Sequence, residues 1–253
     1  MKSAPRLSEL KGPGNTAALH SGLLAAGFLH APIDNAAIDM WHISLAVTES
    51  SLIQHTLLLS TEEQNRASLY TSKPGFRRFV VARSMLRRLL ATYVACSPSE
   101  LTFDYGPHGK PQLAGESAIQ FNLAHSAERA VYAISHQQPV GVDIEHIDRK
   151  INIERLAARF FSKAEHNALQ QISAATRQHE FLRLWTAKEA VIKATGKSLA
   201  QMISQFEIKK ASDGSPRIHA PEFPHLEKIF LSHQSIDDEY VAAVALLPDS
   251  HTA

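Results

Sequence analysis

Residues 181–196 read FLRLWTAKEAVIKATG, and this stretch decides the fold. Its apolar residues recur at helical spacing and a glycine closes it, so we predict one helix from about residue 178 to 194. Glu189 and Lys193 lie one turn apart on that helix. A glutamate four residues before a lysine is an ordinary helix-stabilising pair, so this stretch by itself indicates no chemistry.

A second stretch, residues 141–145, reads GVDIE and is predicted to be a strand. Residues two apart on a strand share a face, so Asp143 and Glu145 leave one side while Val142 and Ile144 face the core. Neighbouring carboxylates repel unless a cation lies between them, and hard oxygen ligands suit Mg²⁺. A solvated polar strand face is the ordinary alternative. Combined with a glutamate and a lysine from the helix, however, the pair would suit a divalent metal that holds a pyrophosphate.

The composition is that of a folded protein. The 253 residues, 44% hydrophobic and 20% charged, allow one large domain or two small ones with a sizeable core. A net charge of +1 creates no overall field that would demand nucleic acid or a membrane surface. The single cysteine, Cys96, excludes an internal disulfide and any zinc site built from cysteines. No apolar run is long enough for a transmembrane helix.

The N-terminal region loosely imitates a secretory signal, because residues 17–29 read AALHSGLLAAGFL. His20, Ser21 and Gly22 interrupt the apolar run, and no clean cleavage site follows it, so we do not expect export. We expect residues 1–38 to form an N-terminal extension, or a short helix docked on the domain. The expected location is the cytoplasm.

The rest of the pattern divides into two halves with the same order of elements. Predicted strands at residues 39–47 and 140–147 are each followed by a Ser-x-x-Glu helix start, a long helix and further strands. We therefore predict an α+β fold of two pseudo-duplicated subdomains, residues 39–138 and 139–248.

The halves are predicted to contain a similar set of helices and strands. In the first half we expect a strand at 39–47, helices at 62–70 and 76–94, and strands at 101–105, 118–123 and 129–134. In the second half we expect a strand at 140–147, followed by three helices: one at 153–160, one that starts at residue 162, and one at 178–194. Strands at 206–210 and 239–247 are expected to follow.

Other polar residues stand where they could bind an anion. His125 lies between two predicted strands, Lys110 projects from a turn-rich loop, and the helix at 76–94 carries five arginines. Each has an ordinary alternative as a structural histidine, a solvated lysine or surface charge. The basic helix could also bind RNA, but no aromatic stacking platform accompanies it. A serine hydrolase is disfavoured because Ser126 lacks a nucleophile elbow.

Taken in order, these motifs resemble the series of the Sfp-type 4′-phosphopantetheinyl transferases. The series is an arginine-bearing helix, Gly-Lys-Pro, Phe-Asn-x-x-His-Ser, Gly-Val-Asp-x-Glu, Phe-Phe-Ser-x-x-Glu and Trp-x-x-Lys-Glu-Ala-x-x-Lys, between about Trp41 and Leu247. Single motifs would be weak signals, but the ordered set is specific. The resemblance implies the fold of that family, with the active site at the interface of the two subdomains.

The resemblance also implies an activity. The chain would transfer the 4′-phosphopantetheine arm of coenzyme A to a serine of an apo acyl carrier or peptidyl carrier protein, and 3′,5′-ADP would leave. Such carriers serve fatty acid, polyketide or nonribosomal peptide synthesis. The alternative is a non-catalytic protein that binds coenzyme A or a nucleotide and docks carrier domains without transfer.

By the same resemblance, individual residues receive roles. Asp143, Glu145 and Glu189 would hold Mg²⁺, with Mn²⁺ as a substitute, and coenzyme A would be the co-substrate. Glu189, Lys193 and His125 would be the catalytic residues, with Glu189 the first choice for the base that accepts the serine proton. Lys193 and His125 would also contact the coenzyme A phosphates. The remaining coenzyme A ligands would be Arg66, Arg78, Lys110, Pro111 and Lys188.

One position departs from the family pattern. The family often has a serine immediately before the histidine, where this chain has Ala124. The missing hydroxyl should weaken coenzyme A binding by about 0.5–1.5 kcal/mol if it bonds a phosphate. The implied metal ligands are intact, so we still expect an enzyme. Because a duplicated chain can supply both sides of the site, we expect a monomer.

Overall fold

The computed structural model describes residues 20–35 and 37–249, and its first half runs to His136. This half opens with a helix over residues 20–25. A short edge strand, three helices and five further strands follow. They are β1 (Leu29–Ala31), β2 (Ile38–Ser44), α3 (Glu49–Leu57), α4 (Thr61–Ser68), α5 (Lys73–Val94), β3 (Phe103–Tyr105), β4 (Pro111–Leu113), β5 (Ile119–Ser126) and β6 (Arg129–His136).

The second half begins at Val140 and uses the same kinds of element. A strand is followed by four helices and then by strands, with one 3₁₀ helix between them. They are β7 (Val140–His146), α6 (Ile153–Phe160), α7 (Lys163–Gln170), α8 (Ala174–Thr195), α9 (Leu199–Met202), β8 (Glu207–Lys210), β9 (Pro216–His219), η1 (Pro224–Lys228), β10 (Phe230–Gln234) and β11 (Tyr240–Leu246).

The pairing of the strands confirms that the fold is α+β and duplicated. The main sheet of the first half has the order β1-β2-β6-β5, and that of the second half has the order β10-β11-β7. In each half, the first long strand (β2 or β7) pairs antiparallel with the last one (β6 or β11). A two-stranded hairpin, β3–β4 or β8–β9, follows the long helix of each half.

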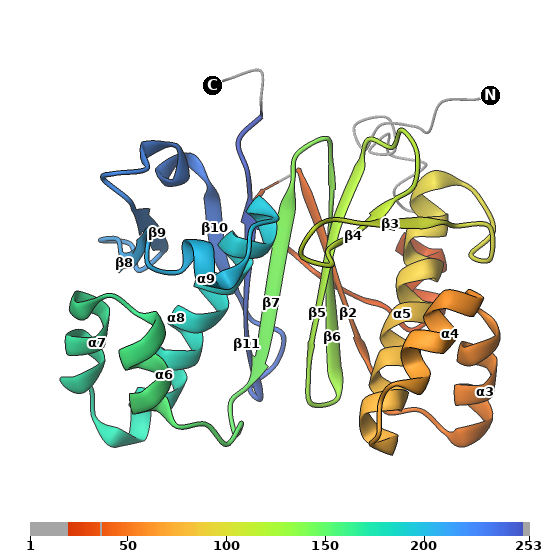
Figure 1. The fold of residues 1–253 in the computed structure, drawn as a ribbon, viewed down its shortest axis with the longest axis horizontal. Helices are drawn as coiled ribbons and strands as arrows, with labels where there is room; N and C mark the ends of the chain where they lie inside the picture. The colour runs from red at the N-terminus through yellow and green to blue at the C-terminus, as the bar shows by residue number, and fades with distance from the viewer. Residues whose placement is uncertain (1–19, 36, 250–253) are drawn as a thin grey trace.

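The two main sheets lie next to each other in the centre of the molecule, with the helices outside them (Figure 1). Helices α3, α4 and α5 lie on one side of the sheets, and α6, α7 and α8 on the other. The space between the sheets is filled by apolar residues of both halves, including Met40, Val131, Val142 and Ile144. Burial of this shared apolar surface holds the halves together. The strands β5 and β7 meet there, where the Val142 N–H donates to Asn122 Oδ1 over 2.9 Å.

A glycine brings α8 close to β7. A Cβ atom added to Gly141 would lie 2.1 Å from the Ala190 carbonyl oxygen and 2.3 Å from the Ala194 amide nitrogen. Only glycine therefore allows the helix backbone to lie this close to the strand. Asp143 and Glu145 share the face of Gly141, so both carboxylates are directed at the same helix.

Most predicted elements are present, and the differences are local. Helix α8 ends at Thr195 and is closed by Gly196 in the left-handed conformation with φ 68°, as predicted, but it begins at Ala174. The sequence patterns did not predict α3, β1, β4, β9 or β10, which are short or lack clear alternation. Strand β1 falls within the predicted N-terminal extension yet pairs with β2. No helix in the described ranges is long and apolar enough to cross a membrane.

Candidate active site

The carboxylates of β7 face the C-terminal half of α8. Asp143 and Glu145 are nearly buried, with exposed fractions of 6% and 8%. Lys193 donates from Nζ to Asp143 Oδ1 over 2.6 Å. Asp143 Oδ2 is also buried, and no group in the described part of the chain donates a hydrogen bond to it. This oxygen therefore lacks a geometrically well-placed partner among the described residues, which a cation could supply.

Glu145 is oriented by two neighbours. Ser126 Oγ, at the end of β5, donates to Glu145 Oε2 over 2.8 Å. Arg149 forms an ion pair with the other carboxylate oxygen from four residues further along the chain. A hydroxyl from the first half thus positions a carboxylate of the second half.

Burial and mutual repulsion disfavour the ionised carboxylates. Burial raises the pKa of Asp143, Glu145 and Glu189, and the charge of Asp143 also raises the pKa of the other two. Burial acts to lower the pKa of Lys193, but the charges of Asp143 and Glu189 outweigh it, so the pKa is raised and the ammonium stays protonated. A divalent cation would relieve this repulsion, so the chemistry of the donor set suits Mg²⁺. In the described residues, however, the three carboxylates do not bring their oxygens within 4.8 Å of one another.

A pocket of about 340 Å³ lies beside these groups and is lined by both halves of the chain. The second half contributes Asp143, Glu145 and Lys193, while the first half contributes His125 and Pro111 among others. This volume is in the range of small-molecule sites. Carboxylates and cations line the same pocket, which suits a ligand that carries both phosphate and a metal ion.

The surroundings of His125 favour the neutral form of its imidazole. Burial, followed by the charges of Lys193 and Arg78, lowers the pKa of its imidazole. A neutral imidazole can still donate one hydrogen bond to a phosphate oxygen. Ala124 beside it also lines the pocket, so the position that departs from the family pattern does present a methyl group instead of a hydroxyl.

The residues expected at the nucleotide end occupy different surroundings. Arg66 and Pro111 line the pocket, and the Arg66 guanidinium lies 5.7 Å from the centre of the Tyr105 ring. Lys110 turns away from this lining, because its Nζ donates to the carbonyls of Val140 and Lys193 over 2.9 and 2.7 Å. Lys110 therefore connects the loop of the first half to the backbone of the second.

Arg78 is engaged elsewhere. Its guanidinium pairs with Glu128 over 3.0 Å, that of Arg77 pairs with the same glutamate over 2.7 Å, and neither arginine lines the pocket. Arg78 acts on the site through its charge, which lowers the pKa of His125.

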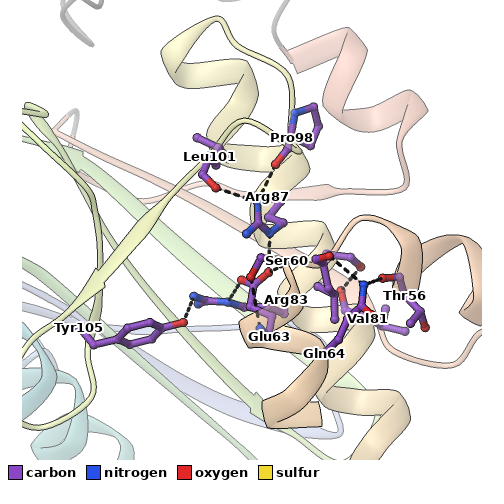
Figure 2. A network of polar contacts seen from close by, with 12 residues as sticks. Thr56, Ser60, Glu63, Gln64, Val81, Arg83, Arg87, Pro98, Leu101 and Tyr105 are labelled. Atoms are coloured by element: carbon purple, nitrogen blue, oxygen red, sulfur yellow. Dashed lines mark hydrogen bonds and ion pairs between the residues drawn. The ribbon is translucent and has the colours of Figure 1, made fainter. Parts of the chain in front are cut away.

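The arginine of α5 that does line the pocket is Arg83, which the sequence patterns did not single out. Its Nε donates to Glu63 Oε1 over 2.6 Å, and its NH2 group donates to the Tyr105 hydroxyl over 2.6 Å. Figure 2 shows Arg83 and Arg87 converging on Glu63. The Ser-x-x-Glu capping box of α4 was the signal that could have found this pair, since it fixes where Glu63 points.

Lys188 does not face the pocket. Its side chain is 0% exposed, and Nζ lies 3.0 Å from Glu165 Oε2. It also donates to the carbonyls of Ile203 and Phe206 over 3.0 and 2.6 Å. These three contacts use the three donors of its ammonium group, so none is left for coenzyme A. The expectation that Lys188 binds coenzyme A is therefore not met, and the residue instead holds α8 to its neighbours.

Comparison with known proteins places the two halves in one family. A family model described as the 4′-phosphopantetheinyl transferase superfamily matches residues 139–245. A second, described as 4′-phosphopantetheinyl transferase, N-terminal, matches residues 44–138. The two matches meet between residues 138 and 139.

Individual relatives agree with the family models. The 4′-phosphopantetheinyl transferase HetI of Nostoc sp. (strain PCC 7120) is 34% identical over 213 residues, which is 83% of this chain and 87% of the relative. The 4′-phosphopantetheinyl transferase Sfp of Bacillus subtilis (strain 168) is 28% identical over 192 residues, 76% of this chain and 84% of the relative. A solved holo-(acyl-carrier-protein) synthase from Bacillus anthracis, in complex with CoA (3′,5′-ADP), covers 44% of this chain and 96% of its own, at 22% identity and a TM-score of 0.35.

The resemblance found in the motifs is thus confirmed over residues 44–245. The chain belongs to the 4′-phosphopantetheinyl transferase superfamily and is a transferase of the Sfp type.

Proposed function

We propose that the chain transfers the 4′-phosphopantetheine arm of coenzyme A to a serine of an apo acyl or peptidyl carrier protein in a Mg²⁺-dependent reaction. Asp143 carries the proposal: one of its oxygens is bound to Lys193, and the other is buried without a donor in the described residues. Asp143, Glu145 and Glu189 would hold the ion, and Mn²⁺ could replace it. When bound, the ion would supply positive charge to neutralise the pyrophosphate of coenzyme A.

The chain's own residues would bind and align the substrates. Lys193 remains cationic and would bind a phosphate oxygen, while the neutral His125 would donate a hydrogen bond to the same group. Arg66 and Arg83, both in the pocket lining, would bind the nucleotide end. Arg83 is thus a proposed coenzyme A ligand that the sequence did not predict. Lys110, which was predicted to contact coenzyme A, would instead hold its loop against β7.

Glu189 would accept the proton of the attacking serine. Its pKa is raised by burial and by the charges of Asp143 and Glu145, which makes it a stronger base than an ordinary carboxylate. The serine oxygen would form a bond to the β-phosphorus of coenzyme A, and the bond from that phosphorus to the bridging oxygen would break. The products would be the holo carrier and 3′,5′-ADP.

Intact-mass spectrometry tests this proposal. Apo acyl carrier and apo peptidyl carrier proteins are incubated with the chain, coenzyme A and Mg²⁺, and in parallel with EDTA in place of Mg²⁺. We expect one phosphopantetheine group to be added to a carrier only when the metal is present. Carriers of unchanged mass, combined with coenzyme A binding in calorimetry, would favour the alternative of a non-catalytic docking protein.

The same experiment compares two glutamate variants. Glu189→Ala should abolish transfer, whereas Glu222→Ala, which changes an exposed residue outside the pocket, should transfer normally. Near-normal turnover of Glu189→Ala would remove Glu189 from the mechanism. We further propose that the chain acts in the cytoplasm. We also propose that it acts as a monomer, because both sides of the pocket come from one chain; light scattering during gel filtration measures the oligomeric state.

A further inference from the structure

Two histidines and an aspartate meet at the β1–β2 edge of the first sheet, whereas the carboxylates of β7 belong to the second sheet. His30 of β1 is the cross-strand partner of Trp41 of β2, and Asp39 lies two residues before Trp41 on the same face. The helix over residues 20–25 brings His20 against them. The ring centre of His20 lies 4.8 Å from that of His30 and 4.9 Å from that of Trp41.

The possible ligand atoms of these residues converge. One ring nitrogen of His20, one of His30 and a carboxylate oxygen of Asp39 all lie within 4.8 Å of one another. Across residues 20–35 and 37–249, no other three His, Cys, Asp or Glu side chains come together in this way. The Nε2 atom of His20 is buried and has no hydrogen-bond partner among residues 20–35 and 37–249. A buried imidazole nitrogen is usually satisfied, so a ligand at this atom would remove an unfavourable contact.

Asp39 is oriented toward the cluster by a chain of hydrogen bonds. The Trp41 Nε1–H donates to the Tyr93 hydroxyl over 2.9 Å, and that hydroxyl donates to Asp39 Oδ2 over 3.1 Å. Oδ1 of Asp39 is thereby left for another partner. An outer hydrogen bond that fixes a carboxylate is a regular feature of metal sites and increases their affinity.

We propose that His20, His30 and Asp39 bind a transition-metal ion of the Zn²⁺ type. Two imidazoles and one carboxylate suit Zn²⁺ and related ions better than Mg²⁺, which prefers oxygen ligands only. This site is independent of the proposed function, whose cation lies among the carboxylates of β7 and α8. The three ligands come from a helix, an edge strand and an inner strand. Binding would therefore fasten residues 20–31 to β2 and raise the melting temperature by mass action.

Metal binding to the full chain tests the site directly. The protein is prepared without a histidine tag, stripped with EDTA, and dialysed against Zn²⁺ in the presence of excess Mg²⁺, which competes for oxygen-only sites. Metal analysis should find one tightly bound Zn²⁺ per chain, and the melting temperature should rise with Zn²⁺ but not with the same addition of Mg²⁺. The absence of saturable Zn²⁺ binding would overturn the proposal.

Variants locate the ion. His20→Gln, His30→Gln and Asp39→Asn should each weaken Zn²⁺ binding by about tenfold or more. Each keeps the approximate size of its side chain, and His20 loses no hydrogen bond from its Nε2, so folding in EDTA should be preserved and is checked by circular dichroism. Tyr93→Phe keeps all three ligands but removes the bond to Asp39, and should weaken binding by roughly tenfold.

Two further variants act as controls. His108→Gln changes an exposed histidine of the loop before β4 and should bind Zn²⁺ normally. Glu145→Gln should do the same while losing transfer activity, which separates the two sites. The proposal is wrong if the variants of His20, His30 and Asp39 bind Zn²⁺ as tightly as the parent protein does. It is also wrong if Glu145→Gln loses Zn²⁺ binding while those three variants retain it.

Discussion

Arg87 and Lys188 occupy equivalent positions in the two halves of the chain. Arg87 Nε lies 2.6 Å from Glu63 Oε2, and Lys188 Nζ lies 3.0 Å from Glu165 Oε2. Both glutamates belong to capping boxes at the starts of the corresponding helices α4 and α7. Both cations also donate to two backbone carbonyls of the segment after the long helix.

These two buried pairs hold each long helix to the helix before it and to the segment after it. In the second half, the residue after Lys188 is Glu189, which does not line the pocket but interacts electrostatically with Lys193, Asp143 and Glu145. The pair of Lys188 with Glu165 thus fixes the helix that carries Glu189 and Lys193, and it does so without touching the pocket.

Lys188→Met should therefore destabilise the protein strongly. It leaves Glu165 buried without its cation, and breaking such a pair costs about 3–5 kcal/mol. Urea unfolding measures the loss. Adding Glu165→Gln to Lys188→Met should recover part of it, because the unpaired charge is then gone. Lys197→Met, at an exposed position just after α8, should leave the free energy of unfolding nearly unchanged; an equal loss there would argue against the buried pair.

Gly141→Ala should disrupt the packing of α8 on β7. The new methyl group would meet the Ala190 carbonyl at 2.1 Å, so the helix has to move, at a cost of about 1–3 kcal/mol or more. Because the same movement separates Lys193 from Asp143, transfer activity should fall as well. Gly22→Ala is the matched control, since nothing lies within 4 Å of a Cβ at Gly22. Unfolding and transfer assays that show normal behaviour for Gly141→Ala would contradict the close approach.

Glu189→Gln should lower the transfer activity and raise the stability of the folded protein. Loss of the proposed base should lower the transfer rate by about 10²-fold or more. The pKa of Glu189 is raised in the folded state, so ionising Glu189 lowers the free energy of unfolding. This loss grows as the pH rises from the pKa of Glu189 in the unfolded chain through its pKa in the folded protein. In EDTA the variant should thus be more stable than the parent at about pH 8, and the difference should shrink toward about pH 5. A variant less stable than the parent at the higher pH would refute the repulsion among the carboxylates.

Lys110 should make stability depend on pH in the alkaline range. Burial, followed by the charge of Lys193, lowers its pKa from 10.5 to about 8. Between these values the unfolded chain binds a proton that the folded protein does not, so the free energy of unfolding should rise with pH across this window. Lys110→Met should lack that increment in urea unfolding, whereas Lys210→Met, at an exposed position, should retain it. Parallel curves for Lys110→Met and the parent would show that Lys110 keeps an ordinary pKa.

Much of the site could be predicted because its residues lie in regular elements. Asp143 and Glu145 share a strand face and Glu189 and Lys193 share a helix face, and both relations follow from the backbone period alone. The order of motifs then identified the family, which the matches to residues 44–138 and 139–245 confirm. Strands β1, β4, β9 and β10 and helix α3 were not predicted, because their residues carry too little periodicity.

The sequence by itself determined which residues have the chemistry of the site, since residue type and spacing are local properties. Only the tertiary structure decided how each cation is used. Lys110, Lys188 and Lys193 are the same residue type, yet Lys110 contacts two backbone carbonyls, Lys188 a buried glutamate and Lys193 the carboxylate of Asp143. The physical reason is that a long flexible side chain takes its partners from elements that folding brings near, which the spacing along the chain does not reveal.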